Sequence, residues 1–157
     1  MNELPSIIQT VSPRTQLGHE GERLAAKFLA QNGYRIVLAN FKVPVGRNSR
    51  GTPVTGEIDI VALDEDILCF IEVKARRSEK FTPAITAVDL RKQRQITRTA
   101  KVYRRIFGVY EMPYRFDVVT VVTSAAEPII ELKKGFWDES KFRKRAWNYE
   151  MWREPMF

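Results

Sequence analysis

The spacing of apolar positions divides the chain into helical and extended segments. Between residues 17 and 32 apolar side chains recur every three or four positions, which predicts an amphipathic helix, and Gly33 follows as a helix stop. A longer helix is expected over residues 86–107. We expect strands over residues 34–41, 57–63, 67–75, 115–122 and 129–132. This order predicts an α/β fold with a mixed β-sheet flanked by helices.

Three segments fall outside this pattern and set the expected domain boundaries. Residues 1–16 contain two prolines and little periodicity, so we expect an N-terminal arm. Residues 43–55 are rich in Gly, Pro, Asn and Ser, which predicts an inserted loop or a flexible hairpin tip. Residues 138–157 are basic and aromatic and are expected to form a closing helix or tail. Its aromatic side chains are expected to dock on the domain or on a partner subunit; the alternative is that they stack on nucleic-acid bases. The central domain is then residues 17–137.

Two of the expected strands, joined by a short acidic turn, bring charged residues together. Side chains alternate between faces along a strand, so Glu72 and Lys74 share one face of the second strand. If the turn has an even number of residues, paired residue numbers sum to 131, and Asp59 lies opposite Glu72 with Cβ atoms about 5 Å apart. An odd turn would put the two acids on opposite faces. The face that carries Asp59 is expected to hold Glu57, Asp59, Val61 and Leu63.

Two carboxylates this close repel each other unless a cation lies between them. A hard divalent ion such as Mg²⁺ (or Mn²⁺) accepts such oxygen ligands. Lys74 lies on the face of Glu72, where it can orient or activate a water or stabilise charge on a phosphate. This set of groups suits phosphodiester hydrolysis. Taken alone, the Glu-x-Lys spacing favours a plainer interpretation, which is an exposed ion pair on one strand face.

The charge balance indicates a polyanionic partner. Lys and Arg number 26 against 19 Asp and Glu, a net charge of +7, which suits nucleic acid, although basic domains with merely solvated surfaces are as common. Residues 86–107 hold seven of these cations against one acid. Lys92 falls on the apolar stripe of this helix, where a lysine side chain either extends to solvent or reaches the acidic centre. The expected nucleic-acid contacts are Arg76, Lys92, Arg94, Arg98 and Lys101.

Several classes of protein are disfavoured. The single cysteine, Cys69, cannot form an internal disulfide, and one histidine leaves too few ligands for a zinc site built from Cys and His. No apolar run approaches the ~20 residues that a membrane helix needs. The first residues lack the features of a secretory signal. We therefore expect a cytoplasmic protein without a membrane partner.

Residues 56–61 (GEIDIV) and 70–76 (FIEVKAR) closely resemble the YraN-like family of predicted bacterial endonucleases. That family belongs to the PD-(D/E)XK, restriction-endonuclease-like superfamily and is often compared with archaeal Holliday-junction resolvases. The resemblance runs from about residue 17 to residue 136. It includes residues 18–22 (GHEGE), 32–34 (NGY) and 115–119 (RFDVV).

The resemblance implies a restriction-endonuclease-like sheet and a Mg²⁺-dependent DNA endonuclease. It implies Asp59 and Glu72 as metal ligands, Lys74 as the catalytic lysine and Glu22, on the first helix, as a further acid at the site. It also favours the acidic centre over solvent for Lys92. Glu20 is the competing choice for that acid, and its plainer role is a solvated acid in the first helical turn. Resolvase-like relatives act as dimers, so a homodimer is expected by analogy.

The sequence departs from the family pattern in three places. Ile58 stands where the superfamily has proline. The segment between Asn40 and Gly56 is longer than the family's short turn and carries Arg47 and Arg50, which either grip substrate or belong to a tolerated insertion. The tail after about residue 138 lies beyond the resemblance.

The leading hypothesis is an endonuclease acting on DNA, including branched or recombination intermediates. The alternatives are a non-catalytic nucleic-acid-binding protein of the same fold and a protein whose basic surface meets an acidic partner.

Overall fold

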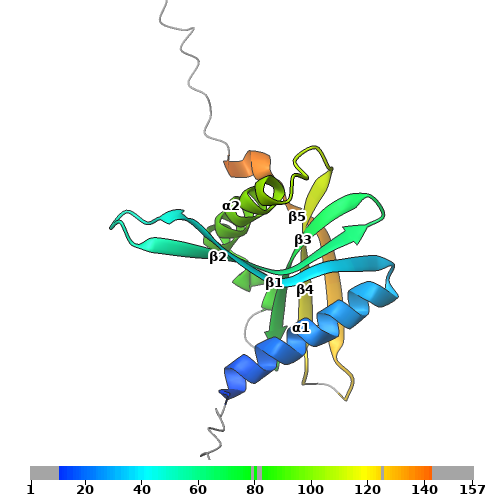
Figure 1. The fold of residues 1–157 in the computed structure, drawn as a ribbon. Coiled ribbons are helices and arrows are strands. Elements are labelled where there is room, and N and C mark those ends of the chain that lie inside the picture. The colour runs from blue at the N-terminus through cyan, green and yellow to red at the C-terminus, as the bar shows by residue number, and fades with distance from the viewer. Residues whose placement is uncertain (1–10, 79, 81–82, 125, 143–157) are drawn as a thin grey trace, which may run out of the picture.

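A five-stranded mixed β-sheet separates two helices that lie on its opposite faces (Figure 1). The computed structural model describes residues 11–78, 80, 83–124 and 126–142. The helices are α1 (Pro13–Gln31) and α2 (Leu90–Ile106), with short 3₁₀ turns at Ala84–Ala87 and Glu139–Phe142. The strands are β1 (Tyr34–Arg47), β2 (Pro53–Asp64), β3 (Ile67–Arg76), β4 (Tyr114–Val122) and β5 (Ile129–Trp137). This architecture confirms the predicted α/β class.

Strand order in the sheet follows chain order. The pairs β1–β2, β2–β3 and β4–β5 are antiparallel, whereas β3 and β4 run parallel. A parallel pair needs a crossover connection, and α2 supplies it. The alternation of strand direction is therefore interrupted once, between the two most buried strands, β3 and β4.

Each face of the sheet has its own hydrophobic core. On one face, Ile96 and Tyr103 of α2 pack with Phe70 and Phe116 of the central strands. On the other face, the fully buried Ala25 and Leu29 of α1 pack on a second cluster. That cluster contains Ile60, Ile71, Val119 and Val121. Each fully buried large side chain contributes about 1.5–3 kcal/mol, so both helices are held by burial on opposite sides of the same strands.

The helix boundaries differ from those expected because of local capping. Helix α1 begins at Pro13, where Ser12 caps it by accepting from Thr15 N at 3.2 Å, so residues 13–16 belong to the helix and not to an arm. Helix α2 begins at Leu90 because Asp89 caps it, with Oδ1 accepting from Lys92 N at 2.9 Å. The preceding residues form a separate 3₁₀ turn in place of the expected first helical turn.

Two expected loops also differ from the structure. Most of segment 43–55 continues β1 and β2 as a hairpin whose turn is residues 48–52, so of the two expected forms the chain adopts the hairpin. Strand β5 continues to Trp137 and exceeds the expected residues 129–132. The expected third helix is only a 3₁₀ turn as far as Phe142, and residues 143–157 lie outside the described residues. Among the described residues, no helix has the length and apolar content to cross a membrane.

Helix α1 approaches the sheet most closely at Gly21. A Cβ atom built there would lie 2.4 Å from the Cβ of Ala75 on β3, well inside van der Waals contact. A Cβ atom built at Gly18, one turn earlier in the same helix, would have no atom within 4 Å. The missing side chain of Gly21 therefore sets the distance between α1 and β3.

We expect Gly21→Ala to destabilise the protein by about 1–3 kcal/mol, because relieving the overlap moves α1 or β3. The matched substitution Gly18→Ala should instead stabilise by about 0.5–1 kcal/mol through helix propensity. Urea unfolding of both variants measures the difference. Equal effects of the two substitutions would contradict the close approach.

Candidate active site

Strands β2 and β3 separate at the position of Asp59. Their pairing runs from Asp64↔Ile67 to Ile60↔Ile71, which confirms the predicted register for these residues. Beyond Ile60 the backbone pairing between β2 and β3 ends, and the Asp59 side chain replaces it: Oδ2 accepts a hydrogen bond from Val73 N at 2.8 Å. Asp59 thus lies in the opening between the two strands and satisfies the Val73 amide, which has no backbone partner on β2.

Side-chain alternation along β2 breaks at the same position. Ile60 packs in the core beneath α1, but Ile58 packs in the core beneath α2 together with Val61. On β1, Ala39 pairs with Ile60 and Phe41 pairs with Ile58, and the intervening Asn40 has a positive φ of 53°. The prediction that Glu57, Asp59, Val61 and Leu63 share one face is therefore wrong, because this irregularity in both strands turns the chain at Asp59.

Glu72 is almost completely buried and lies between two lysines. Its side chain is 3% exposed, and Oε1 forms ion pairs with Lys74 Nζ at 3.0 Å and with Lys92 Nζ at 3.5 Å. The other oxygen, Oε2, is buried without a hydrogen-bond partner. Lys92 reaches the acidic centre from α2, which is the alternative that the family resemblance favours. Glu72 and Lys74 do form an ion pair, but it is not the exposed surface pair considered from the sequence, because Glu72 is buried.

Glu22 completes a group of three acids. Burial and the neighbouring charge of Glu72 raise the pKa of Asp59 to about 8, and the charge of Glu22 adds to this effect. Burial also raises the pKa of Glu22, as do the charges of Glu57 and Glu72, while a hydrogen bond with Asn40 opposes the shift. Glu22 therefore lies within electrostatic range of both acids on the strands.

Glu20, the competing choice on the first helix, points elsewhere. Its carboxylate forms an ion pair with Arg23 at 2.7 Å, and both side chains are about half exposed or more. Such surface pairs contribute little to stability. Of the two acids, only Glu22 lines a hollow together with Asp59.

The donor set fits a small hard cation. Within the described residues, no group of three or more His, Cys, Asp and Glu side chains is arranged to hold a metal ion by itself. Mg²⁺, however, commonly uses one or two carboxylates and takes its other ligands from water and substrate phosphate. Asp59, with its raised pKa, and Glu72, with its unpartnered buried Oε2, are two oxygen donors in a place where added positive charge is favourable. These two residues would hold the ion.

Two hollows of different composition are lined by residues of the candidate site. One, of about 340 Å³, is lined by His19, Glu22, Asn40 and Asp59 among others. The other, of about 570 Å³, is lined on its polar side by Arg14, Lys74, Arg76, Arg77 and Ser78. The second hollow contains four cations and no acid, so it suits a phosphate group beside the centre. Arg76 was expected to contact nucleic acid, whereas Arg14 and Arg77 were missed, because only the fold brings the start of α1 to the end of β3.

The other basic residues expected to bind nucleic acid lie away from the acids. Arg94, Arg98 and Lys101 are exposed on α2, and Arg98 donates to Val45 O of β1, whereas Lys92 is turned inward to Glu72. Asn40 was missed as a site residue. Its only signal in the sequence is a polar residue within a strand pattern, since asparagine is one of the few residues that tolerate a positive φ.

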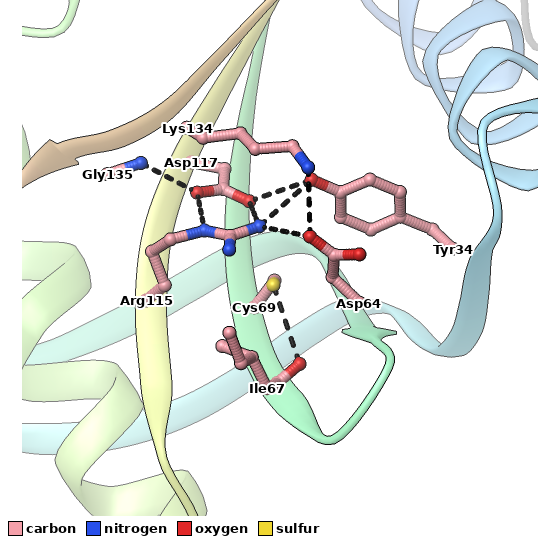
Figure 2. A network of polar contacts seen from close by, with 8 residues as sticks. All are labelled: Tyr34, Asp64, Ile67, Cys69, Arg115, Asp117, Lys134 and Gly135. Carbon is pink, nitrogen blue, oxygen red and sulfur yellow. Dashed lines mark hydrogen bonds and ion pairs between the residues drawn. The ribbon is translucent and has the colours of Figure 1, made fainter.

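A second polar cluster lies around Asp117 and next to the β2–β3 turn, and its labelled side chains contain no buried nitrogen or oxygen atom without a hydrogen-bond partner (Figure 2). Asp117 is fully buried and accepts from Arg115 Nε at 2.7 Å, from Gly135 N at 2.9 Å and from the Tyr34 hydroxyl at 3.3 Å. Arg115 also reaches Asp64 at 2.9 Å, as Lys134 does at 3.0 Å. This cluster joins the β2–β3 turn to β1, β4 and β5, so it is a structural clamp.

Comparison with known proteins places the chain in a family. The model of the uncharacterised protein family UPF0102 matches residues 21–121. A UPF0102 protein of Desulfosudis oleivorans is 41% identical over 111 residues, covering 71% of this chain and 82% of the relative. A UPF0102 protein of Chlorobium chlorochromatii is 39% identical over 131 residues, covering 79% of this chain and 93% of the relative. A crystal structure of SSO0001 has a TM-score of 0.41 at 16% identity over 83% of this chain and 56% of that one, a likeness too weak to inform the fold. The matched region includes Glu22, Asp59, Glu72, Lys74 and Lys92. The chain belongs to the UPF0102 family.

Proposed function

We propose that this protein is a Mg²⁺- or Mn²⁺-dependent endonuclease of the PD-(D/E)XK type that hydrolyses DNA phosphodiesters. The observation that carries the proposal is the buried pair of Asp59 and Glu72, in which Glu72 Oε2 has no partner and two lysines hold Oε1. Buried acids without full compensation are costly in a structural role. Strongly shifted pKa values beside a hollow are typical of catalytic centres.

The chain's own groups can perform the parts of such a reaction. A bound divalent ion supplies Lewis acidity and makes a nearby water more acidic. Asp59 and Glu72 hold that ion, and the Val73 amide fixes the Asp59 carboxylate in place. Lys74, about one quarter exposed, lies next to the hollow lined by arginines, where its ammonium group stabilises negative charge on a phosphate. Lys92 is a positioning residue, since it acts through Glu72.

The distribution of charge favours a polyanionic substrate. The hollow with Arg14, Arg76 and Arg77 opens next to Lys74, and the outer side of α2 adds further exposed cations. Phosphate contacts of this kind position a nucleic acid without reading its sequence. We propose DNA as the substrate, including branched or recombination intermediates. A cleavage assay that compares several DNA structures distinguishes branched from linear substrates.

Asp59→Asn and Glu72→Gln should each abolish cleavage. Removing a direct metal ligand is expected to cost more than the roughly 10- to 100-fold loss that follows loss of an outer partner of a metal site. The assay incubates the purified protein with linear duplex, single-stranded and four-way branched DNA in the presence of Mg²⁺ or Mn²⁺. The matched control is Glu131→Gln, which changes an exposed carboxylate on β5 and should leave the cleavage rate unchanged.

Cleavage that persists in both site variants would reject the proposed centre and indicate a contaminating nuclease. Wild-type protein that binds DNA but does not cut it with either metal would support the non-catalytic nucleic-acid-binding function instead.

Stability without metal should depend on pH through Asp59. Its pKa is about 4 in the unfolded chain and about 8 in the fold, so between these values the folded state retains a proton that the unfolded state has lost. The free energy of unfolding should therefore fall as pH rises through this window, by up to about 1.4 kcal/mol per pH unit. Asp59→Asn should remove that dependence. Chemical unfolding at pH 5 and pH 8 in the presence of a chelator measures it.

The same measurement reports on metal binding without any substrate. At pH 8, Mg²⁺ at about 100 times its Kd should stabilise the wild-type protein by about 2.7 kcal/mol, and Asp59→Asn should respond little. A wild-type protein whose stability ignores both pH and Mg²⁺ would contradict the metal site.

A further inference from the structure

The hairpin formed by β1 and β2 extends beyond the rest of the sheet as a two-stranded arm (Figure 1). Pairing of β2 with β3 ends at Ile60, but pairing of β1 with β2 continues from Val43↔Gly56 to Arg47↔Pro53. We call residues 43–56 the arm. It departs from the sheet at Asp59, so the arm begins where the candidate active site lies.

The tip of the arm has a defined structure. The Asn48 side chain accepts hydrogen bonds from Arg50 N at 2.9 Å and from Thr52 N at 3.0 Å. Arg47 Nη1 donates to Gly51 O at 2.7 Å, and Gly51 adopts the positive φ of 78° that the turn requires. Arg47 and Arg50 are both exposed, and the sequence has no acid between residues 42 and 56. The tip is therefore an ordered turn with two cationic side chains.

The base of the arm is attached to α2. Arg98 Nη2 donates to Val45 O at 2.7 Å, and Gln95 Nε2 donates to Thr55 O at 3.2 Å. Gly56 lies so close to α2 that a Cβ atom there would be 2.0 Å from Thr99 Oγ1. These contacts fix the direction of the arm relative to the helix.

The exposed cations of α2 form one stripe beside the arm. They recur at intervals of three and four residues, so they lie on one side of the helix over about 21 Å of its length. The stripe consists of Arg91, Arg94, Arg98, Lys101 and Arg105. Arg98 belongs both to the stripe and to the attachment of the arm. The stripe and the arm thus form one continuous basic surface.

We propose that the arm inserts into the major groove of B-form duplex DNA next to the site of cleavage, while the stripe on α2 follows the phosphate backbone. This inference rests on the proposed function and adds that the substrate is double-stranded DNA. A two-stranded β-ribbon fits the B-DNA major groove, which is about 12 Å wide. The major groove of A-form RNA is too deep and narrow to admit it.

The length of the arm gives the distance at which it contacts DNA. Pro53 precedes Asp59 by six residues along β2, and a strand rises about 3.3 Å per residue, so the tip lies about 20 Å from the site. At about 3.4 Å per base pair, this distance corresponds to roughly six base pairs. A second copy of the chain is a poorer occupant of the arm, because two such tips would bring like charges together.

The test measures binding in place of cleavage. Fluorescence anisotropy compares a 24-base-pair DNA duplex, the same sequence as an RNA duplex, and single-stranded DNA, with and without Arg50→Ala or the double change Arg47→Ala and Arg50→Ala. All proteins carry Glu72→Gln and are kept in chelator so that no strand is cut. The matched control is Lys27→Ala with Arg35→Ala, which removes the same charge from exposed positions outside the arm and the stripe.

We expect the arm variants to bind the DNA duplex about tenfold more weakly than the control, with little change for RNA duplex and single-stranded DNA. The slope of log affinity against log salt should become shallower by about 0.9 for each arginine that contacts a phosphate. Arg50→Ala leaves the bond between Arg47 and Gly51 intact, so its effect reports on binding and not on folding of the tip.

An equal loss for all three nucleic acids, no loss for any of them, or absence of duplex-DNA binding by the Glu72→Gln protein with an intact arm would overturn the role of the arm. The proposed function fails by a different result, namely metal-dependent cleavage that is absent in the wild type or survives Asp59→Asn and Glu72→Gln.

Discussion

Repulsion between the buried carboxylates of Asp59 and Glu72 constrains the structure around them. Two charges of the same sign at this separation, shielded from water, oppose each other strongly, and the fold compensates only part of the cost. Lys74 and Lys92 both approach the same oxygen of Glu72, and Val73 N approaches Asp59. Burial and the remaining negative charge raise the pKa of Asp59, and Glu72 Oε2 stays buried without a hydrogen-bond partner.

The surrounding elements are arranged so that this centre forms. Helix α2 brings Lys92 from one face of the sheet, and α1 brings Glu22 from the other. Gly21, which directly precedes Glu22 in the sequence, lets α1 lie against Ala75 of β3. The separation of β2 from β3 opens the sheet at Asp59, and the same separation releases the β1–β2 arm. One local irregularity thus accompanies both the opening at Asp59 and the projecting hairpin.

A comparison of two buried acids in the same sheet separates a structural role from a functional one. Asp117 is fully buried, and both of its oxygens accept hydrogen bonds, from Arg115, Gly135 and Tyr34 (Figure 2). Glu72 is buried to nearly the same extent but retains an oxygen without any partner. A satisfied network stabilises a fold, whereas an unsatisfied buried acid is costly unless a ligand completes it. Asp117 and Glu72 lie one position apart in the pairing of β3 with β4, since Ile71 pairs with Asp117 and Glu72 with Val118. The satisfied and the unsatisfied acid are therefore close neighbours in one sheet.

The sequence by itself determined the order of most elements and placed Glu72 and Lys74 on one strand face, because these follow from local periodicity. It left the β2–β3 register open between an even and an odd turn, and the meeting of Lys92 with the acids was favoured by the family resemblance. Tertiary structure decided the rest. The break in alternation at Asp59 depends on the positive φ of Asn40 on a neighbouring strand, which no period-two pattern reveals. The arginine-lined hollow joins Arg14 to Arg77 across more than sixty residues of chain, and the clamp joins Tyr34 to Asp117 in the same way. Such contacts are set by how helices and strands pack and not by the residues nearby in sequence, so only the folded chain contains them.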